Sequence, residues 1–271
     1  LPQLNFSEPE TEGIAVVGMA LQIGPAASEE EFWQMLCRGE DMIGEFPEAR
    51  KEEIAPFRER LYGKVPYVQR AYLPEISQFD AELFHLTPLE AQMMDPEQRL
   101  FLESALSCLQ NAGYEDSIRG SRTGVYVGHS SPDLRYEQLI DMGMGNTDYA
   151  AGVKISGNVE SMIAARVSYL LDLQGPAMVV NTACSSSLSA LHLACSALRS
   201  GEIDAALVGA VKIYLVPGPM GAATGGIQIA ASSGRTKTFD AQADGTGGGE
   251  GVITLLLRPL SLALADGDNI R

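Results

Sequence analysis

Among the residues of this chain, Cys184 has the flanking sequence most typical of a catalytic nucleophile. The apolar residues 177–180 before it predict a buried strand, and leucines at 188, 191 and 198 recur after it at helical spacing. A strand, a tight turn and a helix in this order place Cys184 at a helix N-terminus. The unpaired N–H groups and the positive end of the helix dipole there stabilise a thiolate, the attacking form of cysteine. The same N–H groups can form half of an oxyanion hole, so we expect an acyl-accepting thiol.

The histidines offer this thiol no base from the sequence alone. His192 lies eight residues after Cys184, about 12 Å along a helix axis, which is too far for it to act from the same helix. His85 and His129 each stand alone in their segments. We expect all three to be structural or surface residues.

The other cysteines, Cys37, Cys108 and Cys195, fall within helical patterns, and no C-x-x-C spacing occurs. We expect these three to be buried packing residues without reactivity. This usage is typical of reduced thiols in a cytoplasmic protein and not of a disulfide or zinc framework.

The composition is acidic, with a formal charge of −16 from 19 Lys and Arg against 35 Asp and Glu. Nucleic-acid binding needs a basic surface, so we expect no nucleic-acid partner. The apolar runs are far shorter than the ~20 residues that cross a bilayer, so no membrane partner is expected either. The first residues carry neither the basic region nor the cleavage site of a secretory signal.

The remaining elements indicate one α/β unit over residues 1–271. Apolar runs and helical periodicity predict strands at 13–20, 123–128, 177–180, 205–213 and 252–257 and helices at 29–38, 88–111, 160–171 and 185–200. Such alternation favours a largely parallel or mixed sheet that is covered on both faces. Residues 41–80 are locally basic and predict an irregular, solvated loop; the alternative is a docking patch for an acidic partner.

Several segments together resemble one family. The string N-T-A-C-S-S-S-L at 181–188 resembles the D-T-A-C-S-S-S-L motif of β-ketoacyl synthase (ketosynthase) domains in modular polyketide synthases. Further segments resemble this family's motifs in the same order, at 14–19, 95–100, 164–169, 237–240 and 243–251. Gly157-Asn158 and the glycine-rich 245–251 are most similar to ketosynthases of the trans-acyltransferase type. The glycine-rich segment is not a nucleotide loop, because it lacks G-x-G-x-x-G and leads into a strand.

The resemblance implies a thiolase-like fold, an αβαβα sandwich of two similar halves, of which residues 1–271 are the N-terminal half. In the family, the cysteine lies in this half and two histidines lie in the other. No H-G-T-G-T or N-I-G-H string occurs here. The implied partners are therefore a C-terminal half, an acyl carrier protein whose phosphopantetheine bears the substrate, and a second copy in a homodimer paired near 177–180. The chain itself is expected to bind no cofactor or metal.

On this resemblance, Cys184 accepts an acyl chain for decarboxylative condensation with a carrier-bound malonyl unit. Three departures from the family pattern leave other readings open: Asn181 replaces Asp, Lys212 replaces Asn, and Ser233 replaces Asp. One alternative is a non-elongating ketosynthase that only transfers or holds acyl chains. The other is a docking or structural module without chemistry.

Overall fold

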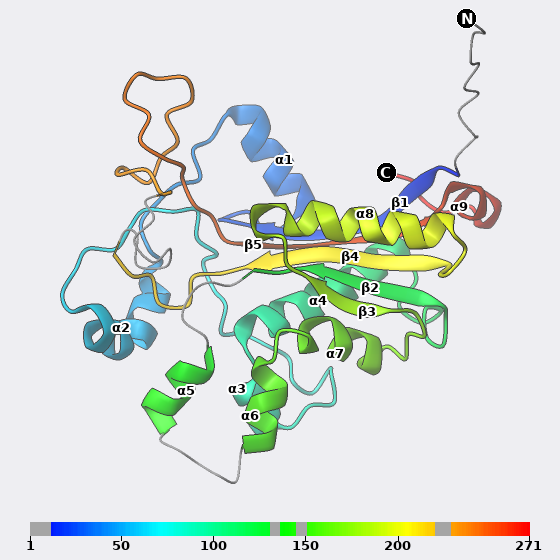
Figure 1. The fold of residues 1–271 in the computed structure, drawn as a ribbon, viewed down its shortest axis with the longest axis horizontal. Coiled ribbons are helices and arrows are strands. Elements are labelled where there is room, and N and C mark those ends of the chain that lie inside the picture. The colour runs from blue at the N-terminus through cyan, green and yellow to red at the C-terminus, as the bar shows by residue number, and fades with distance from the viewer. Residues whose placement is uncertain (1–11, 131–135, 145–150, 220–228) are drawn as a thin grey trace, which may run out of the picture.

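The computed structural model describes residues 12–130, 136–144, 151–219 and 229–271 (Figure 1). The elements in chain order are β1 Ile14–Ile23, α1 Glu29–Arg38, α2 Glu48–Tyr62, α3 Pro88–Met93, α4 Pro96–Ala112, β2 Thr123–Gly128, α5 Tyr136–Met144, α6 Ala151–Asn158, α7 Met162–Leu170, β3 Ala177–Val180, a 3-10 turn Ala183–Ser185, α8 Ser186–Arg199, β4 Ala205–Lys212, β5 Gly251–Pro259 and α9 Leu260–Asp266. All five strands expected from the sequence are present. The expected helices over 29–38, 160–171 and 185–200 are confirmed to within two residues.

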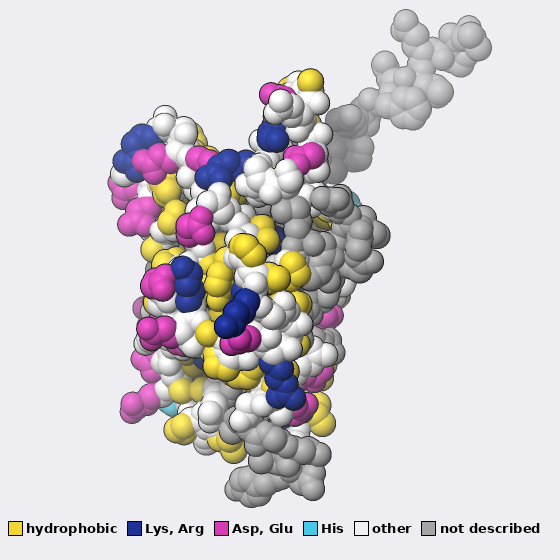
Figure 2. Space-filling view, turned by 90° about the vertical axis from the view of Figure 1, so that its left-hand side faces the viewer, with side chains coloured by type: hydrophobic (Ala, Val, Ile, Leu, Met, Phe, Trp, Pro, Cys, Tyr) yellow, Lys and Arg dark blue, Asp and Glu magenta, His cyan; other side chains and the backbone are white. Residues whose placement is uncertain are grey.

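The strands form one mixed sheet in the order β1-β5-β4-β2-β3. β2 pairs in parallel with both β3 and β4, whereas β5 runs antiparallel to β4 and to β1. The carboxyl ends of β3, β2 and β4 therefore meet at one edge, where β5 begins. We call this the carboxyl edge. It lies toward the left of Figure 1, behind α2, and this side of the molecule faces the viewer in Figure 2, where hydrophobic side chains are exposed between charged ones.

Helices cover both faces of the sheet, as the alternation of elements predicts. Helix α8 packs on one face, and α4 and α7 pack on the other (Figure 1). On the α4 side the core is built of large side chains such as Phe101, Leu207 and Leu256. On the α8 side, Ala190 and Ala194 are fully buried. Small side chains let α8 lie close to the strands.

The single helix expected over 88–111 is in fact two helices, α3 and α4. Proline at position 96 lacks an N–H and disfavours the helical conformation of the residue before it. Asp95 accordingly has ψ of 131° and caps α4, accepting a hydrogen bond from the Glu97 N–H. Proline is favourable at the first position of a helix. The sequence signal for the break was therefore the Asp95-Pro96 pair inside an otherwise helical pattern.

The prediction of a solvated loop over 41–80 is wrong for its centre, which forms α2. Two of the arginines that suggested a basic patch, Arg50 and Arg58, are buried with 1% and 6% exposure. Arg58 donates to the carbonyls of Val65, Pro66 and Pro217. Polar anchors hold this helix, and hydrophobic periodicity cannot detect them.

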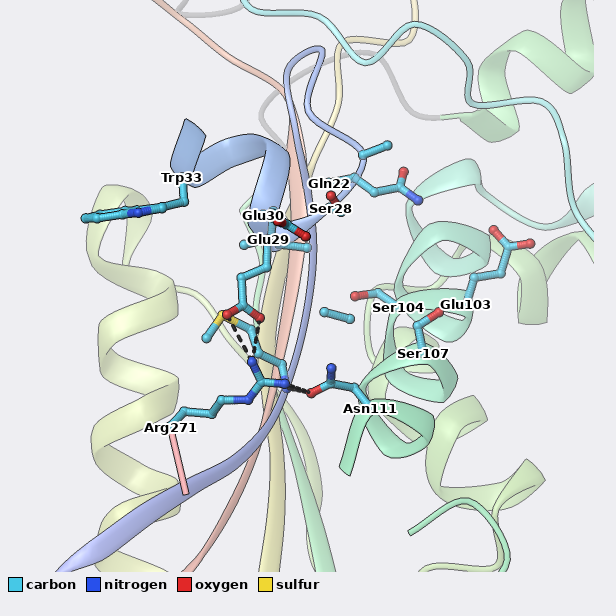
Figure 3. A pocket seen from close by; sticks show the side chains of 14 residues that line it. Gln22, Ser28, Glu29, Glu30, Trp33, Glu103, Ser104, Ser107, Asn111 and Arg271 are labelled. Atoms are coloured by element: carbon cyan, nitrogen blue, oxygen red, sulfur yellow. Dashed lines mark hydrogen bonds and ion pairs between the residues drawn. The ribbon is translucent and has the colours of Figure 1, made fainter. Parts of the chain in front are cut away.

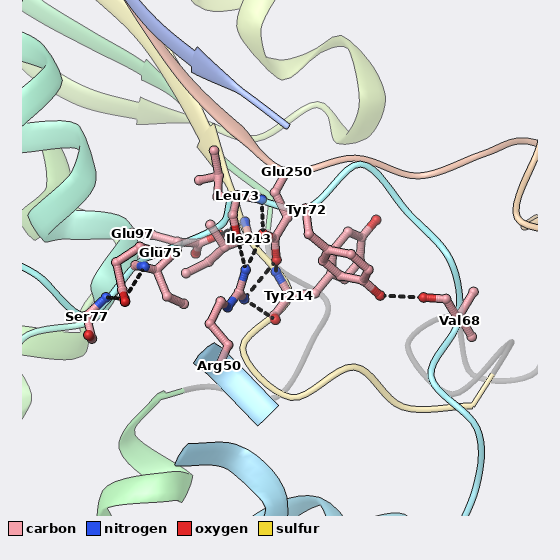
Figure 4. Close-up of polar contacts among 11 residues, drawn as sticks. Arg50, Val68, Tyr72, Leu73, Glu75, Ser77, Glu97, Ile213, Tyr214 and Glu250 are labelled. Atoms are coloured by element: carbon pink, nitrogen blue, oxygen red, sulfur yellow. Dashed lines mark hydrogen bonds and ion pairs between the residues drawn. The ribbon is translucent and has the colours of Figure 1, made fainter. Parts of the chain in front are cut away.

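Arg50 forms the most buried ion pair of the described residues (Figure 4). Its guanidinium donates to both oxygens of Glu250, at 2.6 and 3.1 Å, and to the Leu73 and Tyr214 carbonyls. Glu250 also accepts from the Leu73 and Tyr214 N–H groups. The pair thus fastens α2 and two loops to the start of β5.

Replacing Arg50 with Met should destabilise the full-length protein by about 3–5 kcal/mol, because a buried carboxylate loses its counter-charge. Urea denaturation measures this change. Lys51→Met is the control on the same helix. Its partner Glu48 lies at the surface, so little change is expected. Equal stability of the two variants would contradict the role given to Arg50.

Candidate active site

Cys184 lies in the 3-10 turn that joins β3 to α8, at the carboxyl edge. Its side chain is exposed. Ala183 before it has φ of 55°, a left-handed conformation that is strained for residues with a Cβ. Strain of this kind is found preferentially at functional sites. The expected placement of Cys184 at a helix start is confirmed.

Side chains of the turn hold its backbone in place. The amide oxygen of Asn181 accepts from the Ala183 N–H at 3.2 Å. The hydroxyl of Ser186 accepts from the Thr182 N–H at 3.0 Å and donates to the Ala183 carbonyl at 2.6 Å. An oxygen at position 181 is what the turn uses, and Asn provides one as Asp would. The departure at 181 therefore keeps this hydrogen bond.

A close contact between β2 and α8 fixes where the turn sits. A Cβ on Gly128, the last residue of β2, would lie 2.5 Å from the Cα and N of Ser187. Only glycine permits this approach, since real Cβ atoms do not come so near to backbone atoms. The first turn of α8 is thereby seated directly against the end of β2.

His129, the residue after Gly128, is buried with 4% exposure. Its Nε2 lies 2.7 Å from Oε2 of Glu97, which is also buried. Burial of the ring lowers its pKa, but the hydrogen bond and charge of Glu97, with Glu160 and Asp95, outweigh this effect, so the pKa of His129 is raised. The structural role expected for His129 holds, but its carboxylate partner was missed. Residues 32 positions apart give no periodic signal.

Asp95, the cap of α4, belongs to the same acidic cluster. Burial, and then the charge of Glu97, raise the pKa of Asp95 to about 7. Asp95 N–H donates to the carbonyl of Gly157 at 2.9 Å. The Asp95 side chain therefore titrates near neutral pH although it is a carboxylic acid.

The other histidines and cysteines lie away from this cluster or are inert. His85 and His192 are exposed. Burial raises the pKa of Cys108 to about 12, and Cys195 is half-buried against the α8-side core. The expectation of a buried Cys37 is wrong: it is exposed, and none of α1 is buried. Phe32 and Met35 of α1 are half-buried, whereas Trp33 and Leu36 are exposed like Cys37, so the apolar periodicity of this helix did not translate into full burial.

Comparison with known proteins decides the family. Residues 11–263 match the family described as "Beta-ketoacyl synthase, N-terminal domain". The chain belongs to this family.

Relatives of this β-ketoacyl synthase chain come from fungi and bacteria. It is 36% identical to a highly reducing polyketide synthase of Didymella fabae and 42% identical to the spectinabilin polyketide synthase system protein NorC of Streptomyces orinoci, covering 100% and 94% of this chain. A ketosynthase from module 6 of the bacillaene synthase of Bacillus subtilis 168 has a TM-score of 0.75 at 34% identity over 95% of this chain. The chain spans 14% and 11% of those two polyketide synthases and 41% of that ketosynthase.

The two remaining departures from the β-ketoacyl synthase pattern also make local contacts. The Lys212 ammonium lies 5.0 Å from the centre of the Tyr214 ring. The Ser233 hydroxyl accepts from the Arg235 N–H at 3.4 Å. The glycine-rich segment 245–251 leads into β5, as expected. Its Gly248 carbonyl accepts from Ala71 N–H.

A hollow of about 680 Å³ between α1, β1 and α4 is a separate feature (Figure 3). Arg271 spans it, pairing with Glu29 at 3.1 Å and donating to Asn111 Oδ1 at 2.8 Å. Its lining contains neither cysteine nor histidine, so it offers neither a thiol nor an imidazole. Within the described ranges there is also no cluster of potential metal ligands, and no helix is long and apolar enough to cross a bilayer.

Gly128→Ala should slow alkylation of Cys184 by roughly tenfold. The new Cβ would clash with Ser187 and displace the first turn of α8, and with it the thiol. The rate is measured with iodoacetamide on the full-length protein, by peptide mass spectrometry. Gly152→Ala in α6 is the matched control, since a Cβ there has nothing within 4 Å. Equal rates in both variants would show that the contact does not set the turn.

Stability should fall as the pH rises from the ordinary pKa of an aspartate, 3.8, toward about 7. The raised pKa of Asp95 means that the folded protein keeps a proton that the unfolded chain releases, so stability is lost as the pH rises toward about 7. The raised pKa of His129 acts in the same direction, because its stabilisation is lost as pH rises through the folded value. Asp95→Asn keeps an oxygen for the cap and removes one titration. Its urea midpoint should depend less on pH than that of the wild type, and an unchanged slope would contradict the assignment.

Proposed function

We propose that this chain supplies the acyl-accepting cysteine of a polyketide synthase ketosynthase. The observation that carries the proposal is the exposed thiol of Cys184, on a strained turn at the start of α8. Free N–H groups at a helix start favour the thiolate and can stabilise the oxyanion of a tetrahedral adduct.

The proposed reaction has two stages. The Cys184 thiolate attacks the carbonyl carbon of an acyl-phosphopantetheine thioester; the adduct collapses, the pantetheine sulfur leaves as a thiolate and takes up a proton, and the acyl group stays on Cys184. A malonyl unit on the carrier then loses CO₂, and its carbanion attacks the Cys184 thioester. The new C–C bond gives a β-ketoacyl product, and Cys184 leaves as the thiolate. Two histidines of a C-terminal half would assist the second stage.

The partners follow from the same proposal. Leu188 and Leu193 on α8 are exposed, which supports packing of a C-terminal half against this helix. β3 is an edge strand of the sheet, and its Met178 is exposed. This arrangement supports a homodimer paired through 177–180. In this proposal the phosphopantetheine belongs to the acyl carrier protein, and the chain itself binds no cofactor. We also propose that the protein acts in the cytoplasm.

The trans-acyltransferase subtype is the finer part of the proposal. It rests on Gly157-Asn158 and the glycine-rich 245–251. Gly157 accommodates the α3–α4 junction, since a Cβ there would lie 2.4 Å from the Met93 carbonyl oxygen, and Asn158 donates to that carbonyl at 2.9 Å. The relatives include fungal highly reducing enzymes and bacterial systems, so they do not separate the subtypes.

Two alternatives differ in chemistry. A non-elongating ketosynthase would load Cys184 and release no CO₂ from a malonyl carrier. A docking module would not load at all. The hydrogen-bonded turn around Cys184 favours the two enzymatic functions over the docking module.

Incubation of the full-length protein with an acyl-pantetheine thioester should add the acyl mass to Cys184, observed by intact-mass and peptide analysis. Cys184→Ala should abolish the adduct, while Cys195→Ala, on the same helix, should keep it. Absence of an adduct in the wild type would reject the proposal. CO₂ release from a malonyl-loaded carrier would then separate condensation from simple transfer.

A further inference from the structure

The buried pair of Glu97 and His129 joins three elements at the carboxyl edge. Oε1 of Glu97 accepts from the Ile213 N–H at 2.9 Å, directly after β4. Oε2 of the same carboxylate meets His129 Nε2, directly after β2. A single side chain at the start of α4 therefore ties together the ends of two parallel strands (Figure 4 shows its bond to Ile213).

The backbone of His129 extends this link to residues 181–186, which carry Cys184 and which we call the nucleophile turn. Its N–H donates to the Val180 carbonyl at 3.1 Å. Val180 is the last residue of β3 and precedes Asn181, whose side chain holds Ala183. Gly128, on the other side of His129, is the residue in contact with the first turn of α8. His129 is thus hydrogen-bonded to Val180, just before the nucleophile turn. It also follows Gly128, which contacts Ser187 just after that turn.

The position of the ring depends on Glu97. Nδ1 of His129 is buried and has no hydrogen-bond partner in the described part of the chain. The charged groups that act on the ring are Glu97 and Asp95 from the start of α4 and Glu160 from the segment before α7. A buried ionic pair is seldom a gain in stability over apolar packing. Its hydrogen bonds do, however, fix one geometry at the edge that carries Cys184.

We propose that Glu97 and His129 form a positioning pair for Cys184. Their hydrogen bonds hold the backbone that follows β2, and this backbone holds the nucleophile turn in place. Neither side chain needs to touch the substrate. The inference rests on the proposed role of Cys184 as nucleophile. It predicts that a reactive thiol requires, at position 129, a side chain long enough to hydrogen-bond the side chain at position 97.

Two variants that carry the same amide group on side chains of different length test this requirement in the full-length protein. His129→Gln places an amide N–H at nearly the reach of Nε2, so iodoacetamide should label Cys184 at close to the wild-type rate. His129→Asn carries the same amide on a side chain one methylene shorter, which opens the gap to Glu97. Labelling of Cys184 should then slow by about tenfold, the cost of a small misplacement.

Arg258→Met is the control for general loosening. Arg258 forms a similarly shielded ion pair with Asp268 at the far end of β5. This variant should melt at a lower temperature but leave the rate at Cys184 unchanged below the melting range. A slower rate in Arg258→Met, or equal rates in the Gln and Asn variants, would overturn the proposal.

If His129→Asn does not fold, Glu97→Gln decides the question. Its amide oxygen can still accept from Ile213, and its amide N–H can donate to the imidazole, so labelling close to the wild-type rate is expected. Loss of labelling would overturn positioning through hydrogen bonds. Alkylation needs no acyl carrier, so these results stay interpretable if acyl loading of Cys184 fails, and the acyl adduct can form even if the pair has no role.

Discussion

The candidate site depends on the contact between Gly128 and the first turn of α8. No side chain fits between the end of β2 and the backbone of Ser187, so the helix that follows Cys184 is held against the middle strand of three parallel ones. Buried alanines of α8 continue this close approach along the sheet. Because the helix begins this close to the end of β2, the chain from Val180 turns sharply, and Ala183 adopts a left-handed conformation within the turn. Cys184 is exposed as a consequence of that turn.

Two buried carboxylates stabilise the edge on which this turn lies. Glu97 accepts from the Ile213 N–H, and Glu250 accepts from the next one, Tyr214. Each carboxylate also has a nitrogen partner on a side chain, His129 for the first and Arg50 for the second. Buried backbone N–H groups just after the end of a strand have no partner in the sheet and need other acceptors. Here the acceptors come from α4 and from the segment before β5, so distant parts of the chain converge on the exit of β4.

Buried charged groups therefore surround the turn that carries the thiol. Burial, and then the charge of Glu97, raises the pKa of the Asp95 carboxyl, and the neighbouring acids raise the pKa of the His129 imidazole against the effect of its burial. The same acids lie where a helix start favours negative charge. The family assignment and the solved relatives are consistent with this architecture. The chain covers 41% of the length of the solved ketosynthase from the bacillaene synthase.

The amino-acid sequence by itself determined the local features. The strand at 177–180, the turn, Cys184 at the helix start and the alternation of strands and helices all follow from periodicity, capping and glycine placement over a few residues. Asp95-Pro96 carried the signal for the break between α3 and α4. Only the tertiary structure decided that α2 forms around Arg50 and Arg58, that Cys37 is exposed, and that Glu97 meets His129. These depend on partners far apart in the chain, and polar contacts at such separations leave no periodic pattern in the sequence.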